Sequence, residues 1–182
     1  MALITIEEQQ ALKPLSANWA KMAKLNGGVS HFEQLTGEVE SVDLAKLLGY
    51  ALYQDIVKNP SEARNVTLLE GGTFTDCNGL PVDFKGIKYQ LAYFNYQRYV
   101  NSSSFSDTAT GMRQKTGEKS EPLRDGIIKR ETQFSNAIAM NDFSLMEMYL
   151  NENSDNYPLW VCSNEKKNRP TAEMINLRNT LR

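Results

Sequence analysis

Side chains that could carry out catalysis are few and scattered in this chain of 182 residues. His31 is the single histidine, so a Ser-His-Asp triad would have to use it, yet its position just after Ser30 is typical of a residue at a helix start. Asp76 and Asp83 form a pair of carboxylates that could bind Mg²⁺ through oxygen ligands. Acidic loop residues are common without a metal, so this pair supports a Mg²⁺-dependent nucleic-acid enzyme only as a remote alternative.

The sequence motifs of the common catalytic and cofactor sites are missing. The chain contains no HExxH, no GxxxxGK[ST] and no GxGxxG. Cys77 and Cys162 lie far apart, and neither belongs to a CxxC, which argues against a disulfide framework and against a zinc site. We therefore expect a protein that is not an enzyme, with no catalytic residue, no cofactor and no metal.

The charge and hydropathy of the chain give it no general attraction to nucleic acid or to membranes. The net charge is only -2 at pH 7. No stretch approaches the roughly 18 apolar residues of a membrane span. The N-terminal residues lack a basic region followed by an apolar run, so we expect no secretory signal and synthesis in a reducing cytoplasm.

The helix predicted from Ile87 to about Val100 is apolar or aromatic on two opposite sides. These sides carry Ile87, Leu91 and Phe94 on one face and Tyr89, Tyr93, Tyr96 and Val100 on the other. A helix coated on both sides needs two surfaces to pack against, and we expect one to be its own core and the other a neighbouring subunit. Base stacking is a weaker explanation for the tyrosines because only Lys88 and Arg98 supply basic charge nearby.

A long polar segment follows this helix, and it has no helical or strand periodicity. A loop of about twenty residues inside a compact domain is usually functional or disordered. Between positions 113 and 131 there are six basic and four acidic side chains, so a solvated surface of mixed charge is favoured over a DNA contact. We expect the segment to reach a partner protein. The basic residues that we assign to a subunit or partner contact are Arg113, Lys115, Lys119 and Arg130.

Capping and turn signals predict a mainly α-helical fold around these segments. Thr5 and Glu8 form a capping box for a short helix that Pro14 should end, and Ser16 can cap another. A longer helix is predicted over 30–58, mostly buried from position 44 onward, with Gly49 at a close helix crossing. Residues 66–75 resemble a strand, a turn and a strand, and 76–79 add a further turn, so we expect a small β-hairpin or an ordered loop.

The last long helix, which Ser120 can cap, has the most regular apolar stripe of the chain. A stripe roughly 120° wide is the pattern of a helix that packs one side on a core. It comprises Leu123, Ile127, Phe134, Ala137, Ile138, Leu145, Met148 and Tyr149. Arg130 and Asn141 also project from the stripe, either as a surface edge or as a subunit contact.

We divide the chain into a helical domain, 1–162, and a C-terminal arm, 163–182, that contains a possible partner-docking helix. Pro170 and Thr171 can open this helix, whose apolar face would carry Met174, Leu177 and Leu181. A small amphipathic helix after a polar linker often docks on a partner. It can equally close the core of its own chain, and the sequence leaves both readings open.

Short motifs in the same order resemble the head-to-tail connector proteins of tailed bacteriophages, also called adaptor or neck-ring proteins, especially a group common in phages of gut Bacteroidetes. The matching residues cover about 3–162. They are ITIEE (4–8), LKPLS (12–16), LLG (47–49), FKGIK (84–88), LAYF (91–94), RY (98–99), TG (110–111) with Lys115, SEPL (120–123), YLN (149–151) and YPLW (157–160).

The resemblance implies a helical bundle that assembles into a ring, usually twelve-fold, within the virion. One surface of such a ring meets the portal protein and another meets the next neck or tail protein, while DNA passes through the lumen without sequence-specific binding. The family has no catalytic residues to transfer to this chain. A cytoplasmic adaptor or regulatory module that binds a cellular protein helix is the alternative that the apolar faces leave open.

Overall fold

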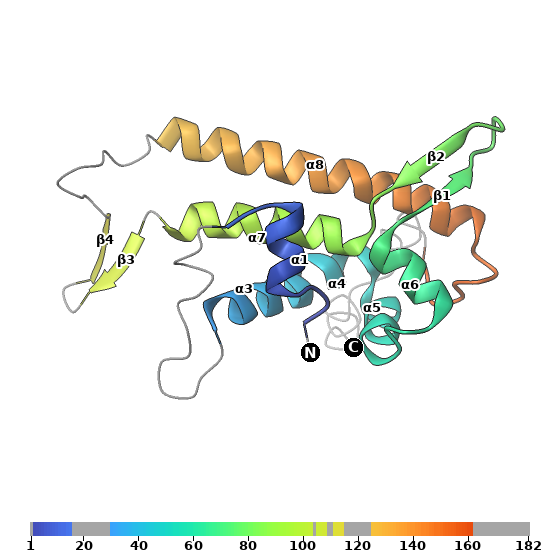
Figure 1. The fold of residues 1–182 in the computed structure, drawn as a ribbon, viewed down its shortest axis with the longest axis horizontal. Coiled ribbons are helices and arrows are strands. Elements are labelled where there is room, and N and C mark those ends of the chain that lie inside the picture. Colours follow the sequence, from blue (N-terminus) through green and yellow to red (C-terminus); the bar gives the residue numbers. More distant parts are fainter. Residues whose placement is uncertain (1, 16–29, 104, 109–110, 115–124, 162–182) are drawn as a thin grey trace, which may run out of the picture.

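The computed structural model describes residues 2–15, 30–103, 105–108, 111–114 and 125–161 (Figure 1). For the described residues between 103 and 125 it describes the backbone alone. The described chain is mainly helical and carries small antiparallel hairpins, which confirms the predicted fold class. Within it, no helix is long and apolar enough to cross a membrane.

Helix α1, Ile6–Leu12, begins and ends where its local signals predict. Thr5 Oγ1 accepts a hydrogen bond from the Glu8 N–H, and the Glu8 carboxylate accepts one from the Thr5 N–H. The buried side chain of Gln9 donates to the carbonyl of Ala92, which ties α1 to the long helix that begins at Ile87. The short helix predicted after Ser16 lies outside the described residues.

The single helix predicted over 30–58 is wrong, because the segment is broken at Gly49. It consists of α3 (His31–Val39), the π-helix η2 (Glu40–Leu44), α4 (Ala45–Leu48) and α5 (Tyr50–Lys58). Gly49 has φ of 81°, a left-handed conformation that ends α4 and starts α5. This segment also has a side that faces solvent, since Tyr50 is 71% exposed and Val42 is 56% exposed.

Residues 63–70 form helix α6 (Ala63–Glu70), so the strand predicted over 66–69 is also wrong. Asn65, Leu68 and Leu69 are buried at helical spacing, while Val66 is exposed. A short apolar run such as this cannot be assigned to strand or helix by periodicity alone. A small hairpin does exist in this region, but it pairs β1 (Gly72–Thr75) with β2 (Pro81–Phe84) around the turn predicted at 76–79, so only its first strand overlaps a predicted one.

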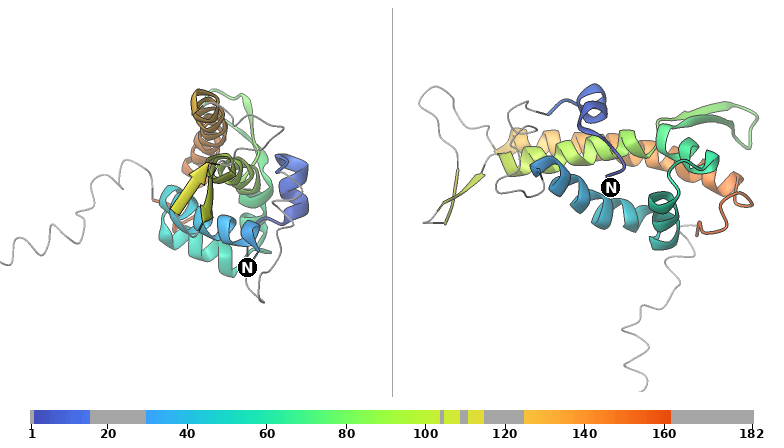
Figure 2. Two further views of the ribbon diagram at one scale, coloured as in Figure 1. Left: turned by 90° about the vertical axis from the view of Figure 1, so that its left-hand side faces the viewer. Right: turned by 60° about the horizontal axis from the view of Figure 1, so that its bottom comes forward.

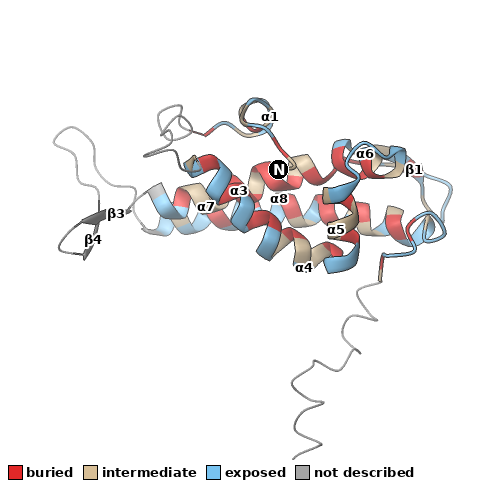
Figure 3. Cartoon of the chain, turned by 90° about the horizontal axis from the view of Figure 1, so that it is seen from below, coloured by how far each residue is buried: buried red, intermediate tan, exposed pale blue. Residues whose placement is uncertain are grey.

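The two longest helices, α7 (Ile87–Ser103) and α8 (Asp125–Glu152), run antiparallel and side by side. In Figures 1 and 2, α7 lies between α8 and the layer formed by α3, α4 and α5. The β1–β2 hairpin is anchored on α8 by Phe84 and Tyr149, whose ring centroids lie 5.0 Å apart. Buried positions alternate with exposed ones in α3, whereas every position of α7 from Ile87 to Val100 is buried or half-buried (Figure 3).

A second hairpin, β3 (Phe105–Thr108) and β4 (Gly111–Gln114), follows α7 in the segment that we predicted to be a loop. The two hairpins lie at opposite ends of the α7–α8 pair (Figure 2). The sequence prediction missed β3 and β4 because their residues show no alternation of apolar and polar types.

Candidate functional site

Helix α8 buries a face that contains several polar residues. That face comprises Thr132, Ser135, Ala139, Asp142, Phe143, Met146 and Leu150. The Asp142 carboxylate accepts hydrogen bonds from the Lys85 backbone N–H at 2.6 Å and from the Gln90 amide at 3.0 Å. Because this carboxylate has partners, its burial is compatible with stability, and it links α8 to the junction between β2 and α7.

Most residues of the apolar stripe predicted from the sequence lie on a different side of α8, which solvent reaches. We call this surface the α8 stripe and define it by Ile127, Phe134, Ala137, Ile138, Leu145 and Met148. Phe134 is 60% exposed, and Ile127 and Met148 are each 39% exposed. The expectation that the whole stripe packs on the core is wrong, since only Leu145, together with Tyr149, packs against it. Leu123 lies outside the described residues.

A groove of about 610 Å³, which we call the α8 groove, runs between the α8 stripe, β2 and the beginning of α7. Phe134, Ile138 and Leu145 form its apolar wall. Tyr89 of α7 and Asn141 of α8 also line it, and Asp83 and Lys85 of β2 and the following turn close the other side. The groove thus brings together two surfaces that the sequence singled out separately: the tyrosine side of α7 and the stripe of α8.

The tyrosine side of α7 is partly covered by the chain itself. The rings of Tyr89 and Tyr93 lie 4.8 Å apart, and the Lys13 ammonium lies 4.2 Å from the centroid of Tyr96. Tyr93 and Tyr96 also pack against the core. Burial, with the hydrogen bond to Tyr93, raises the pKa of Tyr89 to about 12, so its hydroxyl is neutral at physiological pH. The assignment of these tyrosines to a subunit contact stays a prediction.

The other residues that we assigned to an interface do not gather with this groove in the described chain. Arg130 is exposed on α8, and Arg113 belongs to β4, whose side chains are not described. Five further residues lie outside the described part of the chain: Lys115, Lys119, Met174, Leu177 and Leu181.

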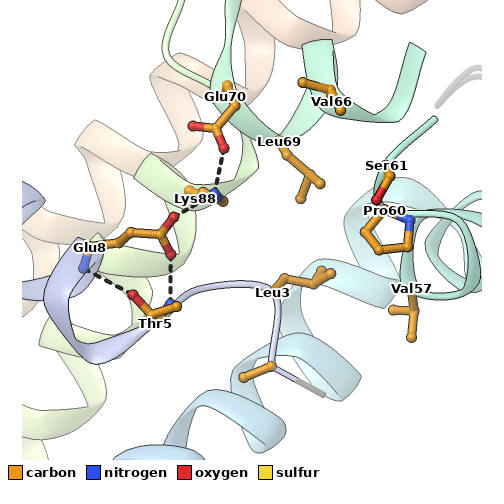
Figure 4. Close-up of a pocket in the computed structure, with 11 residues that line it drawn as sticks. Leu3, Thr5, Glu8, Val57, Pro60, Ser61, Val66, Leu69, Glu70 and Lys88 are labelled. Carbon is orange, nitrogen blue, oxygen red and sulfur yellow. Dashed lines mark hydrogen bonds and ion pairs between the residues drawn. The ribbon is translucent and has the colours of Figure 1, made fainter. Parts of the chain in front are cut away.

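A second site, which the sequence did not indicate, is a pocket of about 240 Å³ beside Lys88 (Figure 4). We call it the Lys88 pocket. Apolar side chains line it: Leu3 before α1, Val57 of α5, and Val66 and Leu69 of α6. The acids Glu8 and Glu70 stand at Lys88, with the Lys88 ammonium 2.5 Å from the Glu8 carboxylate and also bound to Glu70.

The electrostatics of this ion cluster favour its charged form. Burial alone would lower the pKa of Lys88, but hydrogen bonds to Glu70 and Glu8 outweigh burial and raise it. Burial likewise opposes ionisation of Glu8, but Lys88 and the Thr5 N–H hold the pKa of that carboxyl below its usual value. Glu8 and Lys88 are 80 positions apart, so no local pattern could have paired them.

The two aspartates considered for Mg²⁺ are occupied within the β1–β2 hairpin. Asp76 accepts hydrogen bonds from the Asn78 and Leu80 N–H groups, which fixes the turn. Asp83 accepts one from the Thr73 hydroxyl across the two strands. In the described ranges, no group of three or more His, Cys, Asp or Glu side chains is arranged to hold a metal ion.

Residues 44–170 match a protein family of unknown function, DUF6712. The chain belongs to this family. No curated protein and no solved structure matches it. The DUF6712 match includes every residue of the α8 groove, whereas Leu3 and Glu8 of the Lys88 pocket precede its first residue.

Proposed function

We propose that this DUF6712 protein is a structural virion component that forms a head-to-tail connector ring between the portal and the tail of a bacteriophage. The observation that carries the proposal is the exposed α8 stripe. Monomeric proteins rarely leave a long apolar surface uncovered, and such surfaces commonly mark contacts with other proteins. The sequence resemblance to connector proteins supplies the kind of assembly.

Two exposed apolar side chains in another layer of the molecule support ring assembly over a symmetric dimer. Val42 and Tyr50 are exposed in the layer of α3 to α5, and α7 separates that layer from α8. A closed ring uses two different surfaces of each subunit, because every copy contacts one neighbour with each. The α8 stripe and the surface around Tyr50 are candidates for these two contacts.

In this proposal the ring extends and seals the channel through which DNA passes, and its ends bind the portal and the next neck or tail protein. The β1–β2 and β3–β4 hairpins lie at the two ends of the α7–α8 pair, where they are available for such contacts. Within the described chain, the further contact residues that we propose are the tyrosines of α7, Arg113 and Arg130. The mechanism is mechanical, with no catalytic step.

Light scattering and electron microscopy of the purified protein, alone and with the portal encoded nearest to it, test this function. We expect a ring with a central channel, of the twelve-fold kind that the resemblance implies. A strict monomer that binds neither a portal nor a neck protein would contradict the proposal. A one-to-one complex with a cellular protein would favour the cytoplasmic adaptor, and a portal or major capsid gene nearby would favour the connector.

A further inference from the structure

We propose that the Lys88 pocket is the docking site for the C-terminal segment of the same molecule, residues 171–182, which places an apolar side chain in the pocket and arginines at its acidic edge. This docking does not depend on ring assembly, because the pocket is complete within one chain.

The pocket has the chemistry of a site for an aliphatic side chain beside a positive charge. Leu69, which is almost fully buried, lies beside Leu3 and Val66 in the lining. The pocket volume of about 240 Å³ is large enough for a side chain but too small for a large ligand. At its edge, Glu8 and Glu70 share the single ammonium of Lys88, which leaves the cluster with a net charge of -1. The Glu70 side chain is 55% exposed and accessible to a further cation.

The sequence of the C-terminal segment complements this site. Met174, Leu177 and Leu181 recur at helical spacing, and Arg178 and Arg182 each directly follow one of these leucines. From position 163 to the end there are five basic and two acidic residues, a net charge of +3. The remainder of the chain has fifteen basic and twenty acidic residues, a net charge of -5, so attraction between the two parts is expected.

The described chain ends next to the segment that forms one wall of the pocket. The Tyr157 hydroxyl donates to the Arg64 carbonyl at 2.8 Å, and Arg64 donates to the Asn156 carbonyl at 3.2 Å. These bonds hold residues 156–157 against the start of α6. Pro60 and Ser61, which precede α6, line the pocket (Figure 4). The nine residues 162–170 could span up to about 30 Å when extended, so the segment can return to this wall from the point where the described chain ends.

Photo-crosslinking of the full-length protein tests the docking. Leu181 is replaced by the photoreactive residue benzoylphenylalanine, the purified protein is irradiated, and the adducts are mapped by mass spectrometry. We expect the adducts within 2–8 and 57–70. Adducts confined to the α8 groove, or a yield no higher than with the same group at exposed Asn136, would overturn the proposal.

Mixing protein of natural and heavy isotope composition before irradiation identifies the copy that supplies the segment. Docking within one molecule yields adducts whose two peptides carry the same isotope label. Adducts that pair the two labels would overturn docking within one molecule and make the segment a link between copies. This readout works on a monomer, so failure of ring assembly and failure of the docking are distinguishable.

Two valine variants of the crosslinking protein separate pocket occupancy from general effects of a new charge. Val66→Asp places a carboxylate in the pocket wall and should lower the adduct yield about tenfold. Val42→Asp, at an exposed position that does not line the pocket, should leave the yield unchanged. Glu70→Lys, which reverses the exposed acid at Lys88, should also lower the yield, most clearly at low salt. An equal yield in all three variants would contradict the proposal.

Discussion

On helix α8, the apolar Phe134 is exposed and the acidic Asp142, two turns away, is buried. This is the reverse of what their chemistry predicts. Phe134 is 60% exposed, whereas Asp142 is only 4% exposed. Asp142 is buried because it accepts hydrogen bonds from the Lys85 N–H and the Gln90 amide. The orientation of α8 is thus compatible with buried polar bonds inside the subunit and leaves an apolar surface for contacts outside it.

Phe134→Glu should abolish assembly while it leaves the subunit folded. The substitution places a charge in the α8 stripe, where a subunit contact would have to bury it. Because Phe134 contributes little to the core, we expect the free energy of unfolding to change by less than about 0.5 kcal/mol. Light scattering measures the assembly, and circular dichroism with urea denaturation measures the folding.

The neighbouring variant Gln133→Glu adds the same charge at an exposed position of α8 beside the stripe and should assemble normally. A Phe134→Glu protein that is unfolded as a monomer would show that Phe134 belongs to the core. Tyr93→Asp discriminates less well between assembly and folding. Tyr93 packs against the core and its ring lies 4.8 Å from that of Tyr89, so its loss should also reduce stability.

Asp142→Ala should destabilise the fold by about 2 to 3 kcal/mol, because it leaves two buried donors without an acceptor. Asp142→Asn should cost less. Its carbonyl oxygen can still accept from the Lys85 N–H, and its amide can donate to Gln90 Oε1, which has no partner in the described chain, once the Gln90 amide rotates. Urea denaturation measures both variants. Ser144→Ala, at an exposed position of the same helix, is the matched control and should have little effect.

Capping and turn motifs, which depend on residues only a few positions apart, correctly predicted helix α1 and the turn between β1 and β2. Thr5 and Glu8 cap α1 by bonds between neighbours, and Pro14 follows its end. Asp76 and Gly79 form the turn between β1 and β2, again through bonds that span no more than four positions. Such interactions depend on sequence spacing alone, so no tertiary information was needed to find them.

Features that depend on distant residues were not predictable in the same way. The buried side of α8 includes Asp142, whose partners lie more than 50 positions away, and the regular apolar stripe therefore indicated the wrong side. Leu68 and Leu69 form part of a helix because they pack on a core that the local pattern does not contain. The Lys88 pocket depends on Glu8 and Glu70 meeting one lysine of α7, and no spacing rule connects them.

Gly71→Ala should be among the most destabilising single substitutions in the chain. Gly71 has φ of 91°, and a Cβ there would lie 2.4 Å from the Phe84 carbonyl oxygen, a backbone atom that cannot move aside easily. Strain and this clash together should cost about 3 kcal/mol or more. Thermal denaturation followed by circular dichroism measures the effect.

Two other glycines separate the causes of that effect. Gly79 also has positive φ, of 79°, but a Cβ there meets nothing within 4 Å, so Gly79→Ala should cost about 1 kcal/mol from backbone strain alone. Gly37 lies within α3 with open space around it, and Gly37→Ala should stabilise the protein by about 0.5 to 1 kcal/mol. Equal losses at Gly71 and Gly79 would show that the contact with Phe84 is unimportant.

Glu40→Gln should stabilise the protein at neutral pH. Burial raises the pKa of Glu40 above its ordinary value, and the hydrogen bond from the Leu3 N–H offsets only part of that shift. Since the folded state favours the neutral acid, the carboxyl contributes stability below its unfolded pKa of about 4.5 and loses that contribution as the pH rises through its folded pKa. Glutamine retains an acceptor for the Leu3 N–H and carries no charge to bury.

Urea denaturation between pH 5 and pH 8 measures this difference, and the advantage of Glu40→Gln should be greatest at pH 8 and shrink as the pH falls. Glu7→Gln, at an exposed position of α1, controls for the loss of one carboxylate without burial. If Glu40→Gln were instead less stable than the natural protein at pH 7, the hydrogen bond from the Leu3 N–H to the ionised Glu40 carboxylate would outweigh the cost of burying the charge. The π-helix η2 would then serve to hold that carboxylate in its ionised form against the Leu3 N–H.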